Sequence, residues 1–402
     1  MNILFLSTRS PYPLISGHSL RTYHILRGAA EQHKVTLVTF VQLDKEMQKE
    51  NLDHLNSFCH EVHQFRIPTD LSKAKLAIAL FRNLFSSLPF VAQKYDCPEM
   101  RQKIREIIKK EHIDLVHADL LHLAVYLDEF ADLPKVIVNH NVESVRLERW
   151  FQSESNLIKK IFLGLQCGKL RKFERYAMEN FDSCVVVSEI DKQILQDMGV
   201  KNKKLYVVTN GTDTKFFKPT GRETIENSIL WIGNMGVHTN RDAVLYFWRE
   251  IYPFIQKNNP EVKMIFVGTA PPKEIADAAT NNEQVRVTGF VDDIRPYIEG
   301  AAVMVVPIRI GSGTRLKILD AMGMGKAIVS TAVGCEGLDV TDGKDILIAD
   351  DPEDFAEKTN RLLRDKETRH KLEVNARELA KSYDWKHIQE KQEEIYQELV
   401  TS

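Results

Sequence analysis

Short runs of apolar residues alternate with longer amphipathic segments along most of the chain. The first run, Ile3 to Leu6, is followed by a loop rich in proline and glycine, a helical segment over Leu20 to Glu31, and a second run over Lys34 to Phe40. This order of strand, helix and strand is typical of the βαβ unit of a parallel sheet. Because later runs are also continuous stretches of Val, Ile and Leu, we expect strands that are buried on both faces.

The alternation is interrupted over Phe216 to Asn227, where proline, glycine and charged residues collect. It starts again at Ile229 to Ile232, so we interpret the interruption as a linker between two domains. The pattern therefore predicts an α/β protein with two doubly wound parallel sheets. We expect one domain over residues 1–218, a second over residues 225–380, and a terminal helix over residues 381–402 that packs on the first domain.

Composition narrows the class of protein. Hydrophobic residues make up 43% of the chain, and the formal net charge of −2 offers no positive field to hold nucleic acid. The five cysteines are scattered without paired spacing, which argues against a zinc site or a disulfide framework and favours a reducing compartment. No signal peptide is recognisable, and no apolar run approaches the ~20 residues that cross a bilayer. We therefore expect a cytoplasmic protein.

A glycine-rich segment, from Gly311 to Asp320, follows an apolar run and opens a helix. Small residues allow the backbone to approach a ligand, and the free N–H groups and dipole of a helix N-terminus attract an anion. Arg315 and Lys317 add two cations at the same place. The segment predicts a diphosphate site, with a tight turn and solvated charges as the alternative. Its ligand-facing small residues are Gly311, Ser312, Gly313 and Thr314.

The run Asp320-Ala321-Met322, followed by Gly325-Lys326-Ala327-Ile328-Val329, is similar to the signature region of the family-4 retaining glycosyltransferases. Members of that family have the GT-B fold, in which two Rossmann-like domains face a central cleft and a C-terminal helix crosses back to the N-terminal domain. The family carries two acidic residues here, one associated with the donor sugar and one with the ribose. Asp320 stands at the ribose position, whereas Ser312 stands at the sugar position.

The resemblance extends over nearly the whole chain. Ile232-Gly233-Asn234-Met235 is similar to the first loop of the family's C-terminal domain, Gly289-Phe290-Val291-Asp292-Asp293 to its base-binding strand end, and Asn210-Gly211-Thr212-Asp213 to its crossing between domains. The resemblance implies a nucleotide-sugar donor of the UDP or GDP type. The donor-binding residues that it implies are Gly233, Asn234, Val291, Gly311, Ser312, Gly313, Thr314 and Asp320.

Two segments of the first domain resemble the acceptor side of the same family. The loop Pro11 to His18, followed by Arg21, is similar to the family's first loop, and the family places a histidine like His140 beside the transferred sugar. Glu143 contacts either the acceptor or, as a structural partner, Arg146 or Arg149. We interpret His117 and His122 as structural. The acceptor-binding residues implied are Gly17, His18, Arg21 and Glu143.

The family retains the anomeric configuration without an enzymic nucleophile, and the leaving diphosphate accepts the proton of the acceptor. The resemblance therefore assigns the catalytic part to His140, Arg315 and Lys317, with cations of the protein in place of a metal and with no cofactor. The acceptor expected is a glycan or a lipid-linked sugar in polysaccharide biosynthesis. Two alternatives remain open, a nucleotide-sugar 2-epimerase on the same fold and a non-catalytic relative that binds nucleotide-sugars.

The segment Leu76 to Phe90 carries apolar residues at helical spacing, with Lys73, Lys75 and Arg82 nearby. A helix that faces the protein core explains this pattern. Peripheral contact with the inner face of a membrane is the other interpretation, and it would suit a lipid-linked acceptor.

Overall fold

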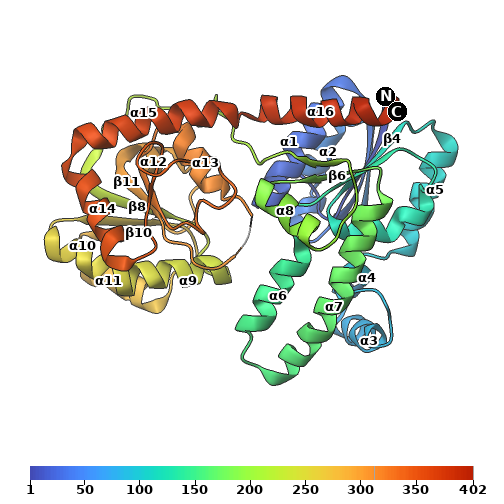
Figure 1. Ribbon diagram of the computed structural model, residues 1–402, viewed down its shortest axis with the longest axis horizontal. Coiled ribbons are helices and arrows are strands. Elements are labelled where there is room, and N and C mark those ends of the chain that lie inside the picture. The colour runs from blue at the N-terminus through green and yellow to red at the C-terminus, as the bar shows by residue number, and fades with distance from the viewer. Residues whose placement is uncertain (312, 402) are drawn as a thin grey trace. The chain divides into compact units, whose positions relative to one another are not determined.

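The computed structural model describes residues 1–311 and 313–401, which divide into two compact units (Figure 1). The first unit holds Met1–Thr209 and the segment that begins at Lys386, and the second holds Asn210–Trp385. Each unit is a parallel sheet covered by helices, which confirms the predicted α/β class with two doubly wound sheets.

The sheet of the first unit has the strand order β3-β2-β1-β4-β5-β6-β7, and its neighbouring strands run parallel. The chain moves outward from β1 to β3 and then returns to β4 on the other side of β1. In an open parallel sheet, ligands bind at the carboxyl ends of the strands where the order reverses. The strands are β1 (Asn2–Ser7), β2 (Lys34–Val41), β3 (Glu61–Arg66), β4 (Leu115–Asp119), β5 (Lys135–Val138), β6 (Ser183–Val186) and β7 (Leu205–Val207).

The helices of the first unit cover both faces of its sheet, and β1 and β4 are almost fully buried between them. The α-helices are α1 (Gly17–Gln32), α2 (Lys49–Asn56), α3 (Lys73–Asn83), α4 (Phe90–Gln93), α5 (Pro98–Lys110), α6 (Glu143–Ser153), α7 (Leu157–Asn180), α8 (Glu189–Asp197) and α16 (Trp385–Thr401). Shorter 3-10 helices are η1 (Asp44–Met47), η2 (Pro68–Leu71) and η3 (Leu121–Glu129). None of the helices in the described part of the chain has both the length and the apolar character needed to cross a membrane.

The terminal helix α16 packs on α1 and on the sheet of the first unit. Gln389 donates through Nε2 to the carbonyl oxygen of His24 at 2.7 Å, and the hydroxyl of Tyr396 lies 2.6 Å from Nδ1 of His117. Gly28 allows this packing, because a Cβ atom there would lie 2.5 Å from Cγ of Gln389. His117 also stacks on Phe5 with ring centroids 4.0 Å apart, so it has a structural part in this core.

The sheet of the second unit has the order β10-β9-β8-β11-β12-β13, and the order reverses between β8 and β11. Its strands are β8 (Ile225–Ile232), β9 (Lys263–Val267), β10 (Val285–Val287), β11 (Ala301–Val306), β12 (Ile328–Ser330) and β13 (Leu347–Ile348). Its helices are α9 (His238–Tyr246), the π-helix η4 (Phe247–Ile251), α10 (Tyr252–Asn258), α11 (Lys273–Asn281), α12 (Arg295–Gly300), α13 (Leu316–Gly323), α14 (Pro352–Arg364) and α15 (Lys366–Ser382).

Several element bounds differ from the sequence expectation for local reasons. Helix α1 begins at Gly17 rather than Leu20, because the hydroxyl of Ser16 caps it by accepting from the N–H of Ser19 at 3.1 Å. Near the end of the second unit, a long helical stretch of the sequence is divided into the two helices α14 and α15. Asp365 separates them, and its carboxylate caps α15 by accepting from the N–H of Thr368 at 3.0 Å.

The compact units divide after Thr209, whereas the sequence places the end of the first domain at residue 218. Residues that follow Thr209 bond within the second unit. The N–H of Thr212 donates to the carbonyl oxygen of Tyr383 at 2.8 Å, and Arg377 donates to the carbonyl oxygen of Phe217 at 2.8 Å. These contacts explain why the segment before the predicted linker already belongs to the second unit.

Candidate functional site

The predicted site residues gather, in each unit, at the carboxyl ends of the strands where the sheet order reverses. In the second unit they follow β8 and β11, and in the first unit they follow β1, β4 and β5. This is the edge at which open parallel sheets bind ligands. The two units are described in turn.

The loop between β11 and α13 depends on its glycines. Gly311 has φ of 123° and Gly313 has φ of 82°, which is the left-handed region that favours glycine. A Cβ atom at Gly311 would also lie 2.9 Å from Nη2 of Arg315, so a side chain there would collide with the guanidinium. The predicted contact at Ser312 lies outside the described residues. The loop therefore brings its backbone and Arg315 to the N-terminus of α13.

Lys317 lies in the first turn of α13 and reaches back to the end of β8. Its Nζ donates to the carbonyl oxygen of Ile232 at 2.8 Å and to Oδ1 of Asn240 at 3.2 Å. Burial, together with the charge of Arg315, lowers the pKa of Lys317 to about 7. Both hydrogen-bond partners are neutral oxygens, and a buried ammonium of this kind is stabilised by an anion.

Asp320 lies one turn further along α13 and is buried. The hydroxyl of Thr212 donates to its Oδ1 at 2.8 Å. Burial raises the pKa of Asp320 to about 7, and Asp213 acts in the same direction. Close to this group, the side-chain amide of Asn210 donates to the hydroxyl of Thr314. The residues predicted on either side of the linker are thus brought together within one unit.

The ends of β8 and β9 approach each other so closely that only glycine fits. A Cβ atom at Gly268 would lie 1.8 Å from the carbonyl oxygen of Gly233, and Gly268 has φ of 143°. Gly233 is held by a hydrogen bond of 2.9 Å from its N–H to the carbonyl oxygen of Val267. Sequence reasoning singled out Gly233 but not Gly268. The sequence feature that could have predicted the importance of Gly268 is its position directly after a buried strand.

Two further donor-side predictions lie at the edge of this region. Asn234 is exposed, and its Oδ1 accepts from the N–H of Gly236 at 2.9 Å, so this side chain shapes the turn after β8. Val291 is half-buried and packs against the core below the loop after β10. Asp293 pairs with Arg295 at 2.8 Å.

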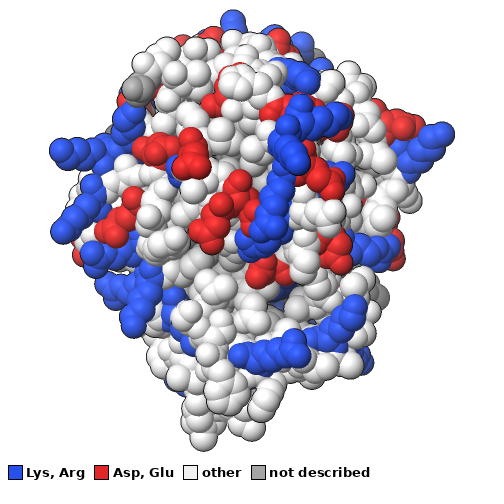
Figure 2. Space-filling model, turned by 90° about the vertical axis from the view of Figure 1, so that its right-hand side faces the viewer, with Lys and Arg blue, Asp and Glu red and all other residues white. Residues whose placement is uncertain are grey.

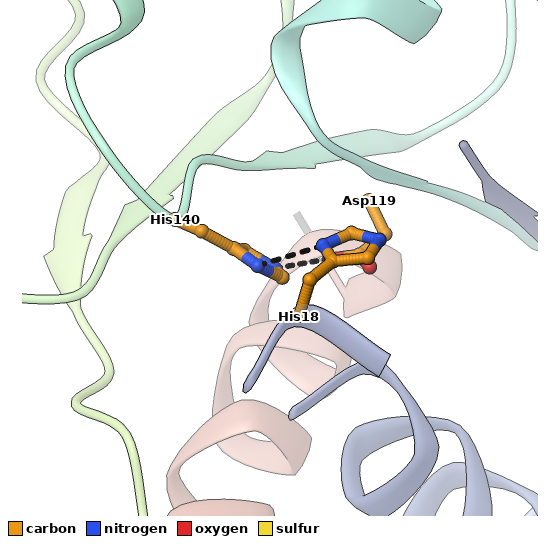
Figure 3. A group of neighbouring side chains, drawn as sticks. All are labelled: His18, Asp119 and His140. Carbon is orange, nitrogen blue, oxygen red and sulfur yellow. Dashed lines mark hydrogen bonds and ion pairs between the residues drawn. The ribbon is translucent and has the colours of Figure 1, made fainter. Parts of the chain in front are cut away.

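In the first unit, three side chains form a hydrogen-bonded chain (Figure 3). His140, which follows β5, approaches Oδ1 of Asp119 with its Nε2 at 2.8 Å. Its Nδ1 lies 3.1 Å from Nδ1 of His18 in the first turn of α1. The hydroxyl of Thr22 donates to the other oxygen of Asp119. Although burial opposes its ionisation, the neighbouring His140 and other histidines hold the pKa of Asp119 well below its usual range.

The hydrogen bonds determine where the protons lie in this chain. A carboxylate only accepts, so the proton of His140 in this contact is on Nε2. When the His140 ring carries only this proton, its Nδ1 accepts and Nδ1 of His18 donates to it. Burial lowers the pKa of His18 to about 3, which keeps this ring neutral. The remaining lone pair is on Nε2 of His18, a buried atom without a hydrogen-bond partner among the described residues.

Both ring nitrogens of His140, the predicted sugar-contacting residue, are therefore engaged within the first unit. Asp119, the last residue of β4, is not among the site residues that the sequence predicts. The available signal was an acidic residue close behind an apolar strand, at an edge that already carried His140. The free acceptor of the group belongs to His18.

The other predicted acceptor-side residues differ in exposure. Arg21 is buried and donates through Nη1 to the carbonyl oxygen of Thr209 at 2.7 Å and through Nη2 to that of Val208 at 2.8 Å, so it holds the loop after β7. Glu143 is buried at the start of α6 and pairs with Arg146 at 2.7 Å, as expected for a structural partner. Gly17 is exposed at the start of α1.

Two groups in this unit have the donor set of a metal site. His60, Glu61 and Glu111 form one of them, and the other lies on the predicted acceptor side. The potential ligand atoms of His18, Asp119 and His140 lie within 4.8 Å of one another. Nδ1 of both histidines and the carboxylate of Asp119 are hydrogen-bonded within the group. A metal ion would have to replace these bonds and displace the proton on Nε2 of His140.

The chain matches two protein families. The family described as "Glycosyltransferase Family 4" matches residues 15–216, and the family described as "Glycosyl transferases group 1" matches residues 226–365. Together the two matches span both sheets. The arrangement of two Rossmann-like sheets is that of the GT-B glycosyltransferases.

Individual relatives are distant. A protein of Klebsiella pneumoniae, described as an uncharacterized 44.6 kDa protein in the cps region, is 22% identical over 366 residues, which is 88% of this chain and 89% of that protein. The N,N'-diacetylbacillosaminyl-diphospho-undecaprenol alpha-1,3-N-acetylgalactosaminyltransferase of Campylobacter jejuni is 24% identical over 230 residues, 54% of this chain and 60% of its own. The crystal structure of Anabaena HepE in complex with UDP has a TM-score of 0.71 at 16% identity, covering 99% of this chain and 100% of that one.

Proposed function

The chain belongs to glycosyltransferase family 4, and from this premise we propose that it moves a sugar from a nucleotide-sugar, of the UDP or GDP type, to a glycan or lipid-linked acceptor with retention of configuration. The observation that carries the donor part is the buried ammonium of Lys317, which has neutral oxygens as partners and Arg315 as its neighbour. Two adjacent cations at a helix N-terminus, beside a backbone without side chains, favour a diphosphate.

In the proposed reaction, a hydroxyl oxygen of the acceptor forms the new bond to the anomeric carbon on the face that the diphosphate leaves. The bond from the anomeric carbon to the diphosphate oxygen breaks, and its electron pair stays on that oxygen. The hydroxyl proton passes to the leaving diphosphate. Arg315, Lys317 and the N–H groups of the loop stabilise the negative charge that develops there. No metal or cofactor takes part in this scheme.

On the acceptor side, we assign the contact with a substrate hydroxyl to Nε2 of His18. This atom has a lone pair and is buried, whereas both nitrogens of His140 are engaged. His140 and Asp119 then act as positioning residues, because they fix the proton of His18 on Nδ1. A substrate hydroxyl next to the reacting one donates to His18 and so orients the substrate, while the proton of the reacting hydroxyl passes to the diphosphate.

Two similar proteins support the substrate classes. HepE was crystallised with UDP, and the Campylobacter jejuni enzyme is named for a sugar linked to diphospho-undecaprenol. The proposal extends both classes, the nucleotide and the lipid-linked acceptor, to this chain.

A ligand panel tests the donor site. We expect UDP or GDP, but not the corresponding monophosphate at equal concentration, to raise the melting temperature of the protein. Lys317→Met is expected to remove the shift. Lys326→Met is the matched control. Lys326 is also buried in this unit and donates to the carbonyl oxygen of Glu299 at 3.1 Å. It follows the C-terminal end of α13, whereas Lys317 lies in the first turn of that helix. No shift with either diphosphate, or an equal shift in Lys317→Met, would contradict the donor assignment.

A second assay separates transfer from epimerisation. The protein is incubated with the nucleotide-sugar that gives the largest thermal shift, with and without an acceptor extract. Release of nucleoside diphosphate that depends on the acceptor supports a transferase. A 2-epimer of the sugar formed without acceptor would identify an epimerase instead, and neither product would point to a binding protein.

A further inference from the structure

Large apolar side chains are exposed on three helices of the first unit, α3, α6 and α7. On α3 and directly after it, Phe81 is 65% exposed and Phe85 is 80% exposed. At the turn between α6 and α7, Leu157 is 71% exposed and Ile158 is 80% exposed, and Trp150 lies close before them. So much apolar surface in one region of a protein indicates an interaction site.

A buried polar junction holds α3 to α4 and α7, and Phe151 of α6 lies against Gly164 of α7. The side-chain amide of Asn83, at the end of α3, donates to Oε1 of Gln93 at 2.6 Å, and Gln166 on α7 donates to Oδ1 of Asn83 at 2.8 Å. Lys169 on α7 donates to the carbonyl oxygen of Asn83 at 2.6 Å. In Figure 1, α6 and α7 extend beyond the sheet as a hairpin with α3 at its side. The apolar side chains are thus held on a common support.

The same region is strongly basic. Residues 72–93 and 149–172 contain nine lysines and arginines and one acidic residue, Glu154, although the whole chain has a net charge of −2. Lys73, Lys75 and Lys159 are exposed among the apolar side chains. In the lower part of Figure 2, where this hairpin lies, blue and white atoms prevail over red.

We propose that the support formed by α3, α6 and α7 docks on the surface of an anionic lipid bilayer. Apolar side chains flanked by lysine and arginine are the combination that binds at the boundary between headgroups and acyl chains. Phe85 and Ile158 enter this boundary, and Lys73, Lys75 and Lys159 pair with lipid phosphates. Trp150 has the amphipathic ring that prefers the same depth.

The charge argues against a second copy of this chain as the occupant. Two identical faces in contact would bring their lysines and arginines together, with few acidic side chains, such as Glu148 and Glu154, to compensate. Like charges brought together at an interface cost several kcal/mol. An anionic bilayer satisfies the apolar and the basic side chains at once. The proposal rests on the first unit alone and does not depend on which sugar is transferred.

Flotation with lipid vesicles tests the proposal on the full chain. We expect binding to vesicles of phosphatidylglycerol and phosphatidylcholine, and at least about tenfold weaker binding to vesicles of phosphatidylcholine alone, because each basic side chain near an anionic surface contributes about a fivefold gain. Lys159→Glu/Lys160→Glu is expected to reduce binding at least about tenfold. The matched control, Lys257→Glu/Lys263→Glu, changes the net charge equally at exposed positions of the second unit and should bind like the wild type.

The apolar contribution is tested in the same assay. Ile158→Glu is expected to weaken binding, whereas Val374→Glu, at a residue 54% exposed on α15, should not. In the unmodified protein, lipids brominated on the acyl chain should quench part of the tryptophan fluorescence. Trp150→Phe should remove that quenching, because Trp231 and Trp385 are buried and the half-buried Trp248 belongs to the second unit. This readout does not depend on whether a charged variant folds.

Three results would overturn the proposal. They are no binding to anionic vesicles, equal binding to neutral vesicles, and unchanged quenching in Trp150→Phe. A dimer in solution that Ile158→Glu dissociates would show that a second copy covers the face instead.

Discussion

The Nδ1 atoms of His18 and His140 lie 3.1 Å apart, so one of them must donate a proton and the other must accept it. When His140 is neutral, Asp119 decides which, because its carboxylate accepts from Nε2 of His140 at 2.8 Å and leaves Nδ1 of that ring as the acceptor. The state of His18 is therefore set by a carboxylate that it does not touch directly.

The first prediction concerns the free nitrogen of this chain. His18→Phe keeps a ring but removes the lone pair of Nε2. We expect kcat to fall about 10- to 100-fold, the loss of one hydrogen bond that orients the substrate, with the Kd for nucleoside diphosphate unchanged. Steady-state transfer rates and a binding titration measure the two quantities. His122→Phe, a buried histidine of the same unit that packs on Tyr95, is the control and should leave kcat near the wild-type value.

The second prediction concerns the orientation of the protons. Asp119→Asn presents an N–H to His140 as well as a carbonyl oxygen, so the ring can turn its proton to Nδ1 and make Nε2 of His18 a donor. We expect kcat to fall about 100-fold or more while the melting temperature changes little. If the variant had a normal kcat and a lowered melting temperature, Asp119 would have only a structural role. The pH profile of kcat should also change, which a purely structural residue would not cause.

The third prediction is a pH dependence of donor binding. Burial lowers the pKa of Lys317 to about 7 in the free protein, and a bound diphosphate raises it again. Below about pH 7 the ammonium is already protonated, whereas above it binding must take up a proton, so the Kd of the nucleotide-sugar should rise by up to about tenfold per pH unit. Calorimetric titrations from about pH 6 to about pH 8.5 measure this slope. Lys317→Arg should bind without the slope, and a flat wild-type profile would contradict the assignment.

The fourth prediction separates stability from binding at Asp320. Burial raises the pKa of Asp320 to about 7, from an ordinary value of 3.8. A carboxyl with a raised pKa in the folded state contributes stability at low pH and loses it as the pH rises through about 7. Asp320→Asn keeps an acceptor for the hydroxyl of Thr212, so at pH 8 the variant should be more stable than the wild type by on the order of 1 to 3 kcal/mol. At pH 4 the difference should vanish.

Donor binding by the same variant should change in the opposite sense. If the carboxylate receives the ribose hydroxyls, as we propose, Asp320→Asn binds the nucleotide-sugar more weakly while it unfolds at a higher temperature. Denaturant unfolding at the two pH values and a binding titration give the two results. Equal donor affinity in both proteins would remove Asp320 from the ribose site.

The fifth prediction concerns metal removal. Since Arg315 and Lys317 supply positive charge at the proposed diphosphate site, a chelator should leave the transfer rate unchanged. Added Zn²⁺ should inhibit, because it would bind His18 and His140 and remove the free acceptor nitrogen. Loss of activity in the chelator, restored by Mg²⁺ or Mn²⁺ but not by Ca²⁺, would contradict the charge scheme.

The sequence predicts the sheets well, because continuous runs such as Val303 to Val306 fit only strands that are buried on both sides. It also predicts the glycine-rich turn before a helix, which the structure has between β11 and α13; that this loop binds the donor stays a proposal. The direction in which a side chain points from its helix or strand is harder to predict from the sequence. Arg21 follows the first loop as the family pattern implies, yet its guanidinium points inward to the carbonyl oxygen of Val208. The direction depends on how α1 rests on the sheet, which no local pattern specifies.

Two features of the first unit show the same limit. Asp119 joins His140 only because β4 and β5 are neighbours in the sheet, and the order of strands is a property of the whole domain. The apolar positions of α3 fit a core-facing helix as well as an exposed one. The exposed fraction of Phe81 separates the two interpretations, since it depends on which elements cover the helix.

The close approach of Gly268 to the carbonyl oxygen of Gly233 has a consequence for mutational scanning. Replacing Gly268 by alanine would force the ends of β8 and β9 apart, so activity would disappear although residue 268 has no side chain to take part in chemistry. A survey that ranks positions by lost activity would place this glycine beside Lys317 and Asp320. Any variant library aimed at the nucleotide specificity of this protein should keep residues 233 and 268 constant and diversify the side chains around them.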